Sequence, residues 1–524
     1  MIASERSLDM PDARHGVLIL GLLAALGAIF MLIVTRWGSG TSPDSANYIR
    51  LARGFSQGFK GLESMPGSLG QHAPLFSMVL SGLSQFGIDA LVGARVVNAA
   101  LFGANIFLVG SAVRRCLPAS SWFPVLAALF TLLALPVLVV HGMVWSEPLF
   151  VFFCLLSVFV LTSYLDSGRR LLLVVSAAAA GMALLTRYAG AALLLCGVCA
   201  LLFLQSRRFV VRLLDALIYG ALGSLPVLLW MLTNWIQGGS ATNRVLAFHP
   251  IGTAHLWQAV HTAASWLLIP ANLPGPARLL LALFLAALLL LLLPATRKQP
   301  VLKLIGSTPA LVKILALFVP VYSLFLVFSI TFLDANTPLD DRILIPVYLS
   351  CLVIVFYIAG NAFQQYGRTV TAAALLALAA LVFGGASVLR AGQWAVLTFR
   401  DGSGFSSRTW QSSDVLAQVR ALPASLTLYS SSPEALYLLA GREALPLPRK
   451  FNTMEQELNK RYQAELAAMK AEIASGRAAL VLFESIQRPN SISEEELMQE
   501  LPLQVCSQAL DGKIYQATEG RCLE

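Results

Sequence analysis

Asp44 is the acidic residue best placed for acid–base chemistry in this chain. It lies in Ser42-Pro43-Asp44-Ser45, directly after the first long apolar stretch. Ser42 as N-cap, Pro43 at the first helical position and an acid in the first turn also describe an ordinary helix start. A carboxylate beside a membrane can in addition be a base with a raised pKa, so the two interpretations do not exclude each other.

Glu147 stands in a similar position between two later apolar stretches. It lies in Trp145-Ser146-Glu147-Pro148, where Ser146 can again serve as N-cap. An ionisable side chain at the membrane edge is costly unless it is paired or used. Glu147 is therefore a candidate to orient a substrate or to bind a divalent metal.

Two arginines are subject to the same argument. Arg187 lies in Leu-Leu-Thr-Arg-Tyr between two apolar stretches, and Arg342 precedes another. Both are candidates to hold an anionic group. Pairing of Arg342 with Asp340 or Asp341 is an equally good interpretation of that segment.

The remaining polar candidates carry weaker signals. A lone histidine at the start of an apolar stretch is more often an interfacial residue than a ligand. No spacing in the chain demands a metal, although a divalent cation remains a candidate cofactor, with Glu147 and His249 as its ligands. The further candidates for substrate or metal contacts are Tyr48, His72, His141, Arg244 and His249.

The composition requires a membrane protein. Of the 524 residues, 57% are hydrophobic and 12% are charged, against about 25% charged in soluble domains. The apolar residues come in blocks of about 20, the length of a membrane-spanning helix. We predict about eleven such helices, and stretches that are apolar on every side exclude a β-barrel. The predicted spans are 16–35, 92–113, 122–140, 148–165, 171–186, 188–205, 214–235, 277–294, 312–333, 343–361 and 370–390.

The charge distribution predicts the orientation. Residues 401–524 contain 12 Lys and Arg against 16 Asp and Glu, a net charge of −4. The whole chain has a net charge of +9, so residues 1–400 have a net charge of +13. The basic excess falls in short loops, as in cytoplasmic loops of membrane proteins, and needs no nucleic acid to explain it. With the N-terminus cytoplasmic, the C-terminal region is extracytoplasmic. The basic loops contain Arg114-Arg115, Arg169-Arg170, Arg207-Arg208 with Arg212, and Arg297-Lys298 with Lys303.

Two domains follow from this pattern. Residues 1–391 form a transmembrane domain with a long first external loop at about 36–90, and residues 392–524 form a soluble domain. In the second, strand-like pieces at 426–429 and 479–483 alternate with helical pieces, including a long charged helix at 453–474. This alternation predicts a small α/β domain. Cys506 and Cys522 are its only cysteines, and an oxidising compartment predicts a disulfide between them.

Together these residues place one main acid, a second acid and several arginines beside a lipid-accessible bundle. The chain resembles the GT-C superfamily of membrane glycosyltransferases, in the bacterial branch that includes protein mannosyltransferases and the lipid A aminoarabinose transferase. The resemblance covers nearly the whole chain. It rests on Asp44 with Tyr48 and Ala52, His72-Ala73-Pro74-Leu75, Arg95-Val96-Val97-Asn98, Ser146-Glu147, Thr186-Arg187, Arg342-Ile343-Leu344-Ile345-Pro346, and Tyr429 to Tyr437 with Gly441-Arg442.

The resemblance implies a function and a role for each site residue. Asp44 would be the catalytic base, Arg187 and Arg342 would bind the phosphate of a polyprenyl-phosphate sugar donor, and Glu147 would orient the acceptor or the sugar. An inverting hexosyl or pentosyl transfer to a glycan, lipid or protein on the outer face of the bacterial inner membrane is expected. The single acid at the first-loop position differs from the Asp-Glu pair of some protein mannosyltransferases, which weakens the case for a protein acceptor.

Two other functions use similar residues. A secondary transporter or lipid flippase also buries charges, but such proteins usually place them at the bilayer midplane within inverted repeats, and no internal repeat is evident here. A non-catalytic envelope assembly factor would use the soluble domain to bind a partner. Substitution of Asp44 distinguishes both alternatives from the enzyme, because only the enzyme is expected to lose its activity.

Overall fold

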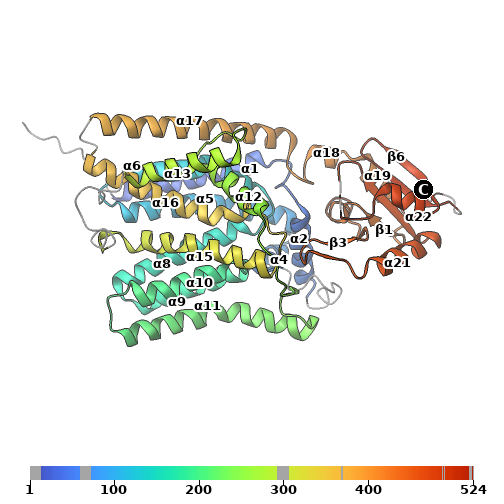
Figure 1. Cartoon of the computed structure of the whole chain (residues 1–524), viewed down its shortest axis with the longest axis horizontal. Helices are drawn as coiled ribbons and strands as arrows, with labels where there is room; N and C mark the ends of the chain where they lie inside the picture. Colours follow the sequence, from blue (N-terminus) through green and yellow to red (C-terminus); the bar gives the residue numbers. More distant parts are fainter. Residues whose placement is uncertain are drawn as a thin grey trace, which may run out of the picture.

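The computed structural model describes residues 13–58, 72–291, 306–366, 370–486, 488, 490–518 and 522. Within these ranges a bundle of long helices forms one part of the molecule and a small α/β domain the other (Figure 1). Part of the predicted first external loop, residues 59–71, and the predicted basic loop at Arg297-Lys298 and Lys303 lie outside the described residues.

Most helices of the bundle agree in position with the predicted apolar spans, and three short helices, at 43–56, 75–84 and 253–266, lie outside those spans. The bounds of the bundle helices are α1 (Ala13–Val34), α2 (Pro43–Ser56), α4 (Leu75–Ser84), α5 (Ala90–Cys116), α6 (Trp122–Leu133), α7 (Leu135–Gly142), α8 (Glu147–Ser167), α9 (Arg170–Thr186), α10 (Gly190–Phe203), α11 (Phe209–Gly238), α12 (Thr253–Trp266), α13 (Gly275–Leu291), α15 (Ala310–Phe332), α16 (Asp341–Tyr366) and α17 (Val370–Asp401).

Among the described residues, seven helices are long and apolar enough to cross a membrane. They are α1, α5, α8, α11, α15, α16 and α17. The pair α6 and α7, which is bent by 54°, adds an eighth when it is counted as one span. The apolar helices α9, α10 and α13 are shorter than this criterion requires. The chain therefore has the helical membrane architecture that its composition predicts.

Close helix packing holds the bundle together. Helix α5 contacts α1, α6 and α8, and α9 packs against α8 and α11. A Cβ atom on Gly181 of α9 would lie 2.8 Å from the carbonyl oxygen of Gly223 in α11. Only glycine allows these two backbones to approach so closely, as is common where membrane helices pack.

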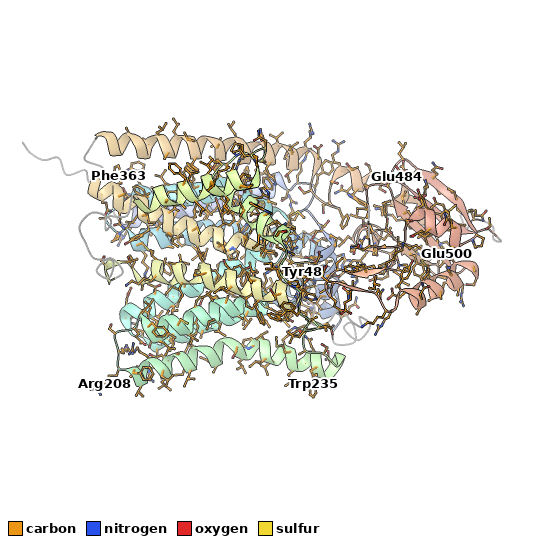
Figure 2. The ribbon with its side chains drawn as sticks, viewed as in Figure 1. Tyr48, Arg208, Trp235, Phe363, Glu484 and Glu500 are labelled. Atoms are coloured by element: carbon orange, nitrogen blue, oxygen red, sulfur yellow. A yellow bond between two sulfur atoms is a disulfide. The ribbon has the colours of Figure 1, made fainter. Side chains whose placement is uncertain are left out.

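The first three basic loops gather at the end of the bundle that is far from the α/β domain. Arg115 forms an ion pair with Asp166 at 2.6 Å, and Arg207 donates to the carbonyl oxygen of Gly168. Figure 2 shows Arg208 at this end of the molecule. The structure thus brings together the short loops that the charge pattern groups on one side.

The opposite, domain-facing end is covered by short helices. Helices α2 and α4 lie between the bundle and the α/β domain, and α12 lies toward the same end (Figure 1). Ser77 of α4 donates to the carbonyl oxygen of Tyr48 in α2. Helix α12 is anchored to the loop before α16, because Thr262 donates to the carbonyl oxygen of Leu339.

The C-terminal domain contains a five-stranded sheet in the order β2-β1-β5-β7-β6. Strand β1 pairs in parallel with β2 and β5, whereas β7 pairs antiparallel with β5 and β6. The strands are β1 (Thr427–Ser430), β2 (Leu445–Pro446), β5 (Ala478–Phe483), β6 (Leu503–Ala509) and β7 (Gly512–Ala517), and a separate hairpin joins β3 (Phe451–Asn452) to β4 (Glu457–Leu458).

Both faces of this sheet are covered. The central strand β5 is buried at every position, as expected for a strand between two layers of helices. One face packs against α19 (Asp414–Ala421), and the other packs against α21 (Tyr462–Ala474) and α22 (Glu494–Glu500). The remaining helical segments are α18 (Arg408–Gln411), α20 (Pro433–Ala435) and the π-helical turn η2 (Leu436–Ala440). The α/β class of this domain is confirmed.

The predicted start of one helix in this domain is wrong. The charged helix expected at 453–474 begins only at Tyr462, because residues 453–458 form the turn and second strand of the β3–β4 hairpin. The tip of this hairpin contacts the bundle: the amide of Ala335 donates to the carbonyl oxygen of Met454.

Helix α17 joins the two domains. It continues to Asp401, so the predicted boundary between residues 391 and 392 lies within it. After it, Gly404 forms a backbone bridge with Thr41, which immediately precedes α2. Gly404 has φ +56°, and a Cβ there would lie 2.0 Å from the Thr41 carbonyl oxygen, so this junction requires glycine.

Cys506 and Cys522 are joined by a disulfide, with Cα atoms 5.4 Å apart. The bond ties strand β6 to the C-terminal residues of the domain. The other five cysteines are free thiols, and they lie in or beside the bundle helices.

Candidate active site

The start of α2 places Asp44 at the domain-facing end of the bundle. Ser42 is the N-cap, and its amide donates to the Ser45 hydroxyl at 2.9 Å. The Ser45 hydroxyl in turn donates to the carbonyl oxygen of Val144, at the start of the turn before α8. The helix start that the sequence predicts is therefore real, and it also fixes Asp44 against a second segment of the chain.

Glu147 begins α8 and lies beside Asp44 in the same cluster. Its side chain is 1% exposed. One oxygen, Oε1, accepts from Arg187 Nη1 and, at 2.5 Å, from Arg342 Nε. The other oxygen, Oε2, is buried and has no hydrogen-bond partner among the described residues.

Arg342 connects the two acids. Its Nη1 donates to Asp44 Oδ2 at 2.6 Å, while its Nε donates to Glu147. The alternative that Arg342 pairs with its neighbours is wrong. Asp340 instead accepts from the amide of Ile343, and the Asp341 carboxylate accepts from the indole of Trp266.

Asp44, Glu147, Arg187 and Arg342 thus form one group, which we call the ion network. It contains two carboxylates and two guanidinium groups, so its charges balance. Helix starts supply Asp44 and Glu147, where the positive end of the helix dipole favours an acid. Arg187 follows the last residue of α9, and Arg342 lies in the first turn of α16.

Hydroxyl and aromatic groups surround the ion network. The Tyr48 hydroxyl lies 3.0 Å from the Ser146 hydroxyl, which also accepts from Arg187. The guanidinium of Arg342 lies 4.5 Å from the ring centroid of Trp145. Figure 2 shows Tyr48 where the bundle meets the α/β domain. The sequence offers Ser146 as an N-cap and, with Glu147, as a motif of the resemblance, whereas for Trp145 adjacency to Glu147 is the available signal of a role in the site.

Asp44 is the accessible acid of the pair, with 38% of its side chain exposed. Burial is the largest single influence and acts to raise the pKa of its carboxyl, but the lowering influences, led by the positive charge of Arg342, together outweigh it. The pKa therefore lies below the ordinary value of 3.8, so the sequence-based expectation of a raised pKa is wrong. The Asp44 carboxylate is ionised at neutral pH and can accept a proton.

His72 lies just before α4 and packs against Tyr48 of the site. Its ring centroid lies 4.9 Å from that of Tyr48, and its Nε2 is buried without a partner among the described residues. Burial lowers the pKa of the imidazole from 6.5 to about 4, with Arg187 and Arg342 adding to the shift and Asp44 opposing it. His72 is therefore neutral at pH 7. Tyr48 is neutral as well, because burial and Glu147 raise the pKa of its phenol.

The other sequence candidates lie outside the ion network. Arg244 pairs with Asp334 at 3.5 Å, although its charge still acts on His72. His249 Nε2 contacts the carbonyl oxygen of Glu455 in the β3–β4 hairpin, so it links the bundle to the α/β domain. His141 is fully buried within the bundle, where it contacts Asn105 and Val137.

The described residues contain no group of three or more His, Cys, Asp or Glu side chains placed to hold a metal ion. Glu147 is engaged by two arginines and His249 by a backbone carbonyl. The ion network supplies positive charge through guanidinium groups, which can hold a phosphate by themselves.

No protein-family model matches the chain, and no curated protein matches it in sequence. Solved structures with the same fold are found. ArnT from Cupriavidus metallidurans in the apo state has a TM-score of 0.57 at 16% identity, over 96% of this chain and 98% of that chain. ArnT bound to undecaprenyl phosphate has a TM-score of 0.56 at 14% identity, over 94% and 97% of the two chains.

A larger protein shares part of the fold. The arabinofuranosyltransferase AftD from Mycobacteria has a TM-score of 0.50 at 16% identity, and the match covers 95% of this chain but 40% of AftD. ArnT and AftD are GT-C glycosyltransferases, so the predicted resemblance is confirmed at the level of the fold. The chain has the GT-C fold and resembles ArnT over nearly its whole length.

Proposed function

We propose that the chain is a membrane glycosyltransferase that moves a hexosyl or pentosyl group from a polyprenyl phosphate to an acceptor hydroxyl. The observation that carries the proposal is the ion network: a half-exposed, ionised Asp44 held beside two guanidinium groups at the domain-facing end of the bundle. The GT-C fold and the undecaprenyl phosphate bound to ArnT support it.

The proposed reaction assigns a role to each member of the network. Asp44 accepts the proton of the acceptor hydroxyl as its oxygen attacks the anomeric carbon. The bond from that carbon to the phosphate oxygen breaks, and the lipid phosphate leaves without needing a proton. Direct displacement inverts the anomeric centre.

The arginines supply the electrostatic part of this mechanism. Arg342 uses Nε and Nη1 for the two acids, and its Nη2 donates to no described residue. A donor phosphate that takes up Arg342 would weaken the hold of this cation on Asp44 and so make the carboxylate a stronger base. Arg187 donates to Glu147 Oε1 and orients the carboxylate, which leaves Glu147 Oε2 to accept from a sugar hydroxyl.

Tyr48, His72 and Arg244 complete the proposed substrate surface. Tyr48 and His72 are neutral and their rings are in contact, so they can contact a sugar without adding charge. Arg244 lies beside Asp334 on the loop before α12 and adds positive charge near His72. A glycan, a lipid or a protein can each present the acceptor hydroxyl.

We further propose a bacterial inner-membrane location with the N-terminus cytoplasmic and the α/β domain extracytoplasmic. The clustering of the basic loops far from this domain supports this orientation. In intact cells, Cys506 and Cys522 should then react with a thiol reagent only after reduction. Reaction of both without reduction would contradict the orientation.

Transfer of radiolabelled sugar from a panel of polyprenyl-phosphate donors by purified protein in lipid tests the function. Asp44→Asn should lower transfer by about 10²- to 10⁴-fold while the helical content and melting temperature stay near native. Asp414→Asn, an exposed acid that begins α19, is the matched control and should keep full activity. If no donor is consumed, or if Asp44→Asn is fully active, the transporter and assembly-factor hypotheses replace the enzyme.

A further inference from the structure

Arg278 is a buried cation that has no acidic partner in the described part of the chain. It lies in the first turn of α13, and 5% of its surface is exposed. Its Nη1 contacts His261 Nδ1, and its Nη2 donates to the carbonyl oxygen of His261 at 3.2 Å. Its Nε is buried and has no partner within the described ranges, where no carboxylate lies within ion-pair distance of the side chain.

The two arginines of the ion network, in contrast, each have an acidic partner. Arg187 and Arg342 are each paired with Glu147, although both are more exposed than Arg278, at 18% and 16% of the side chain. A guanidinium cannot lose its proton in a protein, so burial does not remove the charge of Arg278. A buried charge without a counter-ion costs several kcal/mol. In membrane proteins, such a group usually marks a functional site.

The contact with His261 defines the hydrogen-bonding groups of this site. Because a guanidinium can only donate, His261 Nδ1 must accept, and the proton of the neutral imidazole is then on Nε2. His261 Nε2 donates to no residue in the described part of the chain. Arg278 Nε and His261 Nε2 are therefore two donors, one of them on a cation, that have no acceptor among the described residues. Their natural partner is an anion.

The surroundings point to lipid as the source of that anion. Helices α12 and α13 pack as a hairpin, and α12 lies toward the α/β domain (Figure 1). Trp257 of α12 packs on Gly275, the first residue of α13, and such amphipathic rings are common at the headgroup level. Beyond this turn α13 presents a strongly exposed apolar surface of a kind that contacts acyl chains. It comprises Leu280 at 68%, Leu283 at 58% and Phe284 at 63% exposure.

We propose that Arg278 and His261, under Trp257, bind the phosphate of a membrane phospholipid headgroup. No hydrogen bond or ion pair among the described residues joins this pair to the ion network, so the site is separate from the one that contains Asp44. The phospholipid stabilises the α12–α13 hairpin, and α12 in turn holds the loop that leads to Arg342 through Thr262 and Leu339. The proposal does not depend on glycosyl transfer.

Thermal unfolding of the full-length protein tests this site. The protein is delipidated in a glycoside detergent that contains no phosphate and is then titrated with phosphatidylglycerol. Diacylglycerol with the same acyl chains shows how much of the effect comes from the chains without the phosphate. Inorganic phosphate shows how much comes from a free anion without the lipid. The native chain should melt at a higher temperature with phosphatidylglycerol and show no such rise with the other two.

Arg278→Gln should require roughly tenfold more phosphatidylglycerol for half of this rise, since a charge-assisted contact is lost. Arg408→Gln, an exposed arginine outside the bundle, is the matched control and should respond like the native chain. Asp44→Asn should also show the full rise in melting temperature with phosphatidylglycerol. The lipid site can therefore be tested independently of the proposed enzyme activity. Should Arg278→Gln not be recovered folded, His261→Phe removes one donor and keeps the cation, and a several-fold weaker response is expected.

Three results would overturn the proposal. Phosphatidylglycerol could stabilise both site variants as well as it stabilises the native chain. Diacylglycerol could raise the melting temperature equally, in which case the phosphate has no part in the effect. Inorganic phosphate alone could give the full rise, and the site would then bind a free anion and not a lipid.

Discussion

Two polar clusters lie at opposite ends of the bundle and are built in different ways. The ion network at the domain-facing end combines two acids with two arginines. At the other end, Tyr164 and Gln205 both donate to the carboxylate of Asp215, without a cation in contact with it among the described residues. We call these three residues the Asp215 cluster.

Asp44 and Asp215 differ in exposure, and this difference indicates a structural role for the Asp215 cluster and a chemical role for the ion network. Tyr164, Gln205 and Asp215 are at most 7% exposed, and each donor already has its acceptor. In the ion network, Asp44 is 38% exposed. Each cluster has one buried oxygen without a partner among the described residues, Gln205 Oε1 and Glu147 Oε2. A cluster whose acid is inaccessible can stabilise the fold, whereas one with an accessible acid can act on a substrate.

The largest expected effect comes from Arg342→Gln. It removes the cation that holds both acids, and it should lower the rate of sugar transfer by at least about 10²-fold and the stability by up to about 3 kcal/mol. The double variant Asp44→Asn with Arg342→Gln restores the charge balance. It should recover much of the stability and none of the activity, as measured by denaturant unfolding and by transfer. Recovery of neither would mean that the network is only structural.

Tyr164→Phe tests the other side of the comparison. Loss of a hydrogen bond to a buried carboxylate should cost about 1.5–3 kcal/mol of stability. Sugar transfer measured below the melting temperature should stay within twofold of native. A large loss of activity in a well-folded variant would show that the Asp215 cluster does more than stabilise.

The pH dependence of stability should come in part from His72. The unfolded chain binds a proton at the ordinary pKa of 6.5, whereas the folded chain does so only at a pKa of about 4. The depressed pKa of this base means that stability is fully present above pH 6.5 and falls as the pH is lowered toward 4. Between pH 6.5 and 5 the loss should be about 1–2 kcal/mol. His72→Gln should flatten this part of the profile of melting temperature against pH, and an unchanged slope would contradict the assignment.

The smallest effect is expected at the exposed edge of the domain interface. Arg50 of α2 pairs with Glu443 at 3.0 Å and also lies 4.3 Å from the ring of Tyr437. Because Glu443 is 67% exposed, Glu443→Gln should change the stability by less than about 1 kcal/mol. Tyr437→Ala, which also removes packing against α2, should cost more. Equal effects would mean that the ion pair and not the packing joins the domains there.

Local patterns were sufficient for much of this structure. Blocks of apolar residues predict helices because only a helix satisfies its own backbone in lipid. The helix starts at Asp44 and Glu147 follow from caps and prolines, and alternating short pieces predict the α/β class of the C-terminal domain. The prediction failed at residues 453–461, where pairing of two short strands outweighed the helix propensity of the charged segment.

By itself, the sequence determined that the chain is a membrane protein, that its short basic loops lie on one side of the membrane, and which polar residues are candidates for the site. Only the tertiary structure decided their partners. Arg342 lies beside two aspartates in sequence, yet it binds Asp44 and Glu147, which are 298 and 195 residues away. The physical reason is that packing of α2, α8, α9 and α16 brings these side chains together, and the resulting cation lowers the pKa of Asp44 where the sequence suggested a rise.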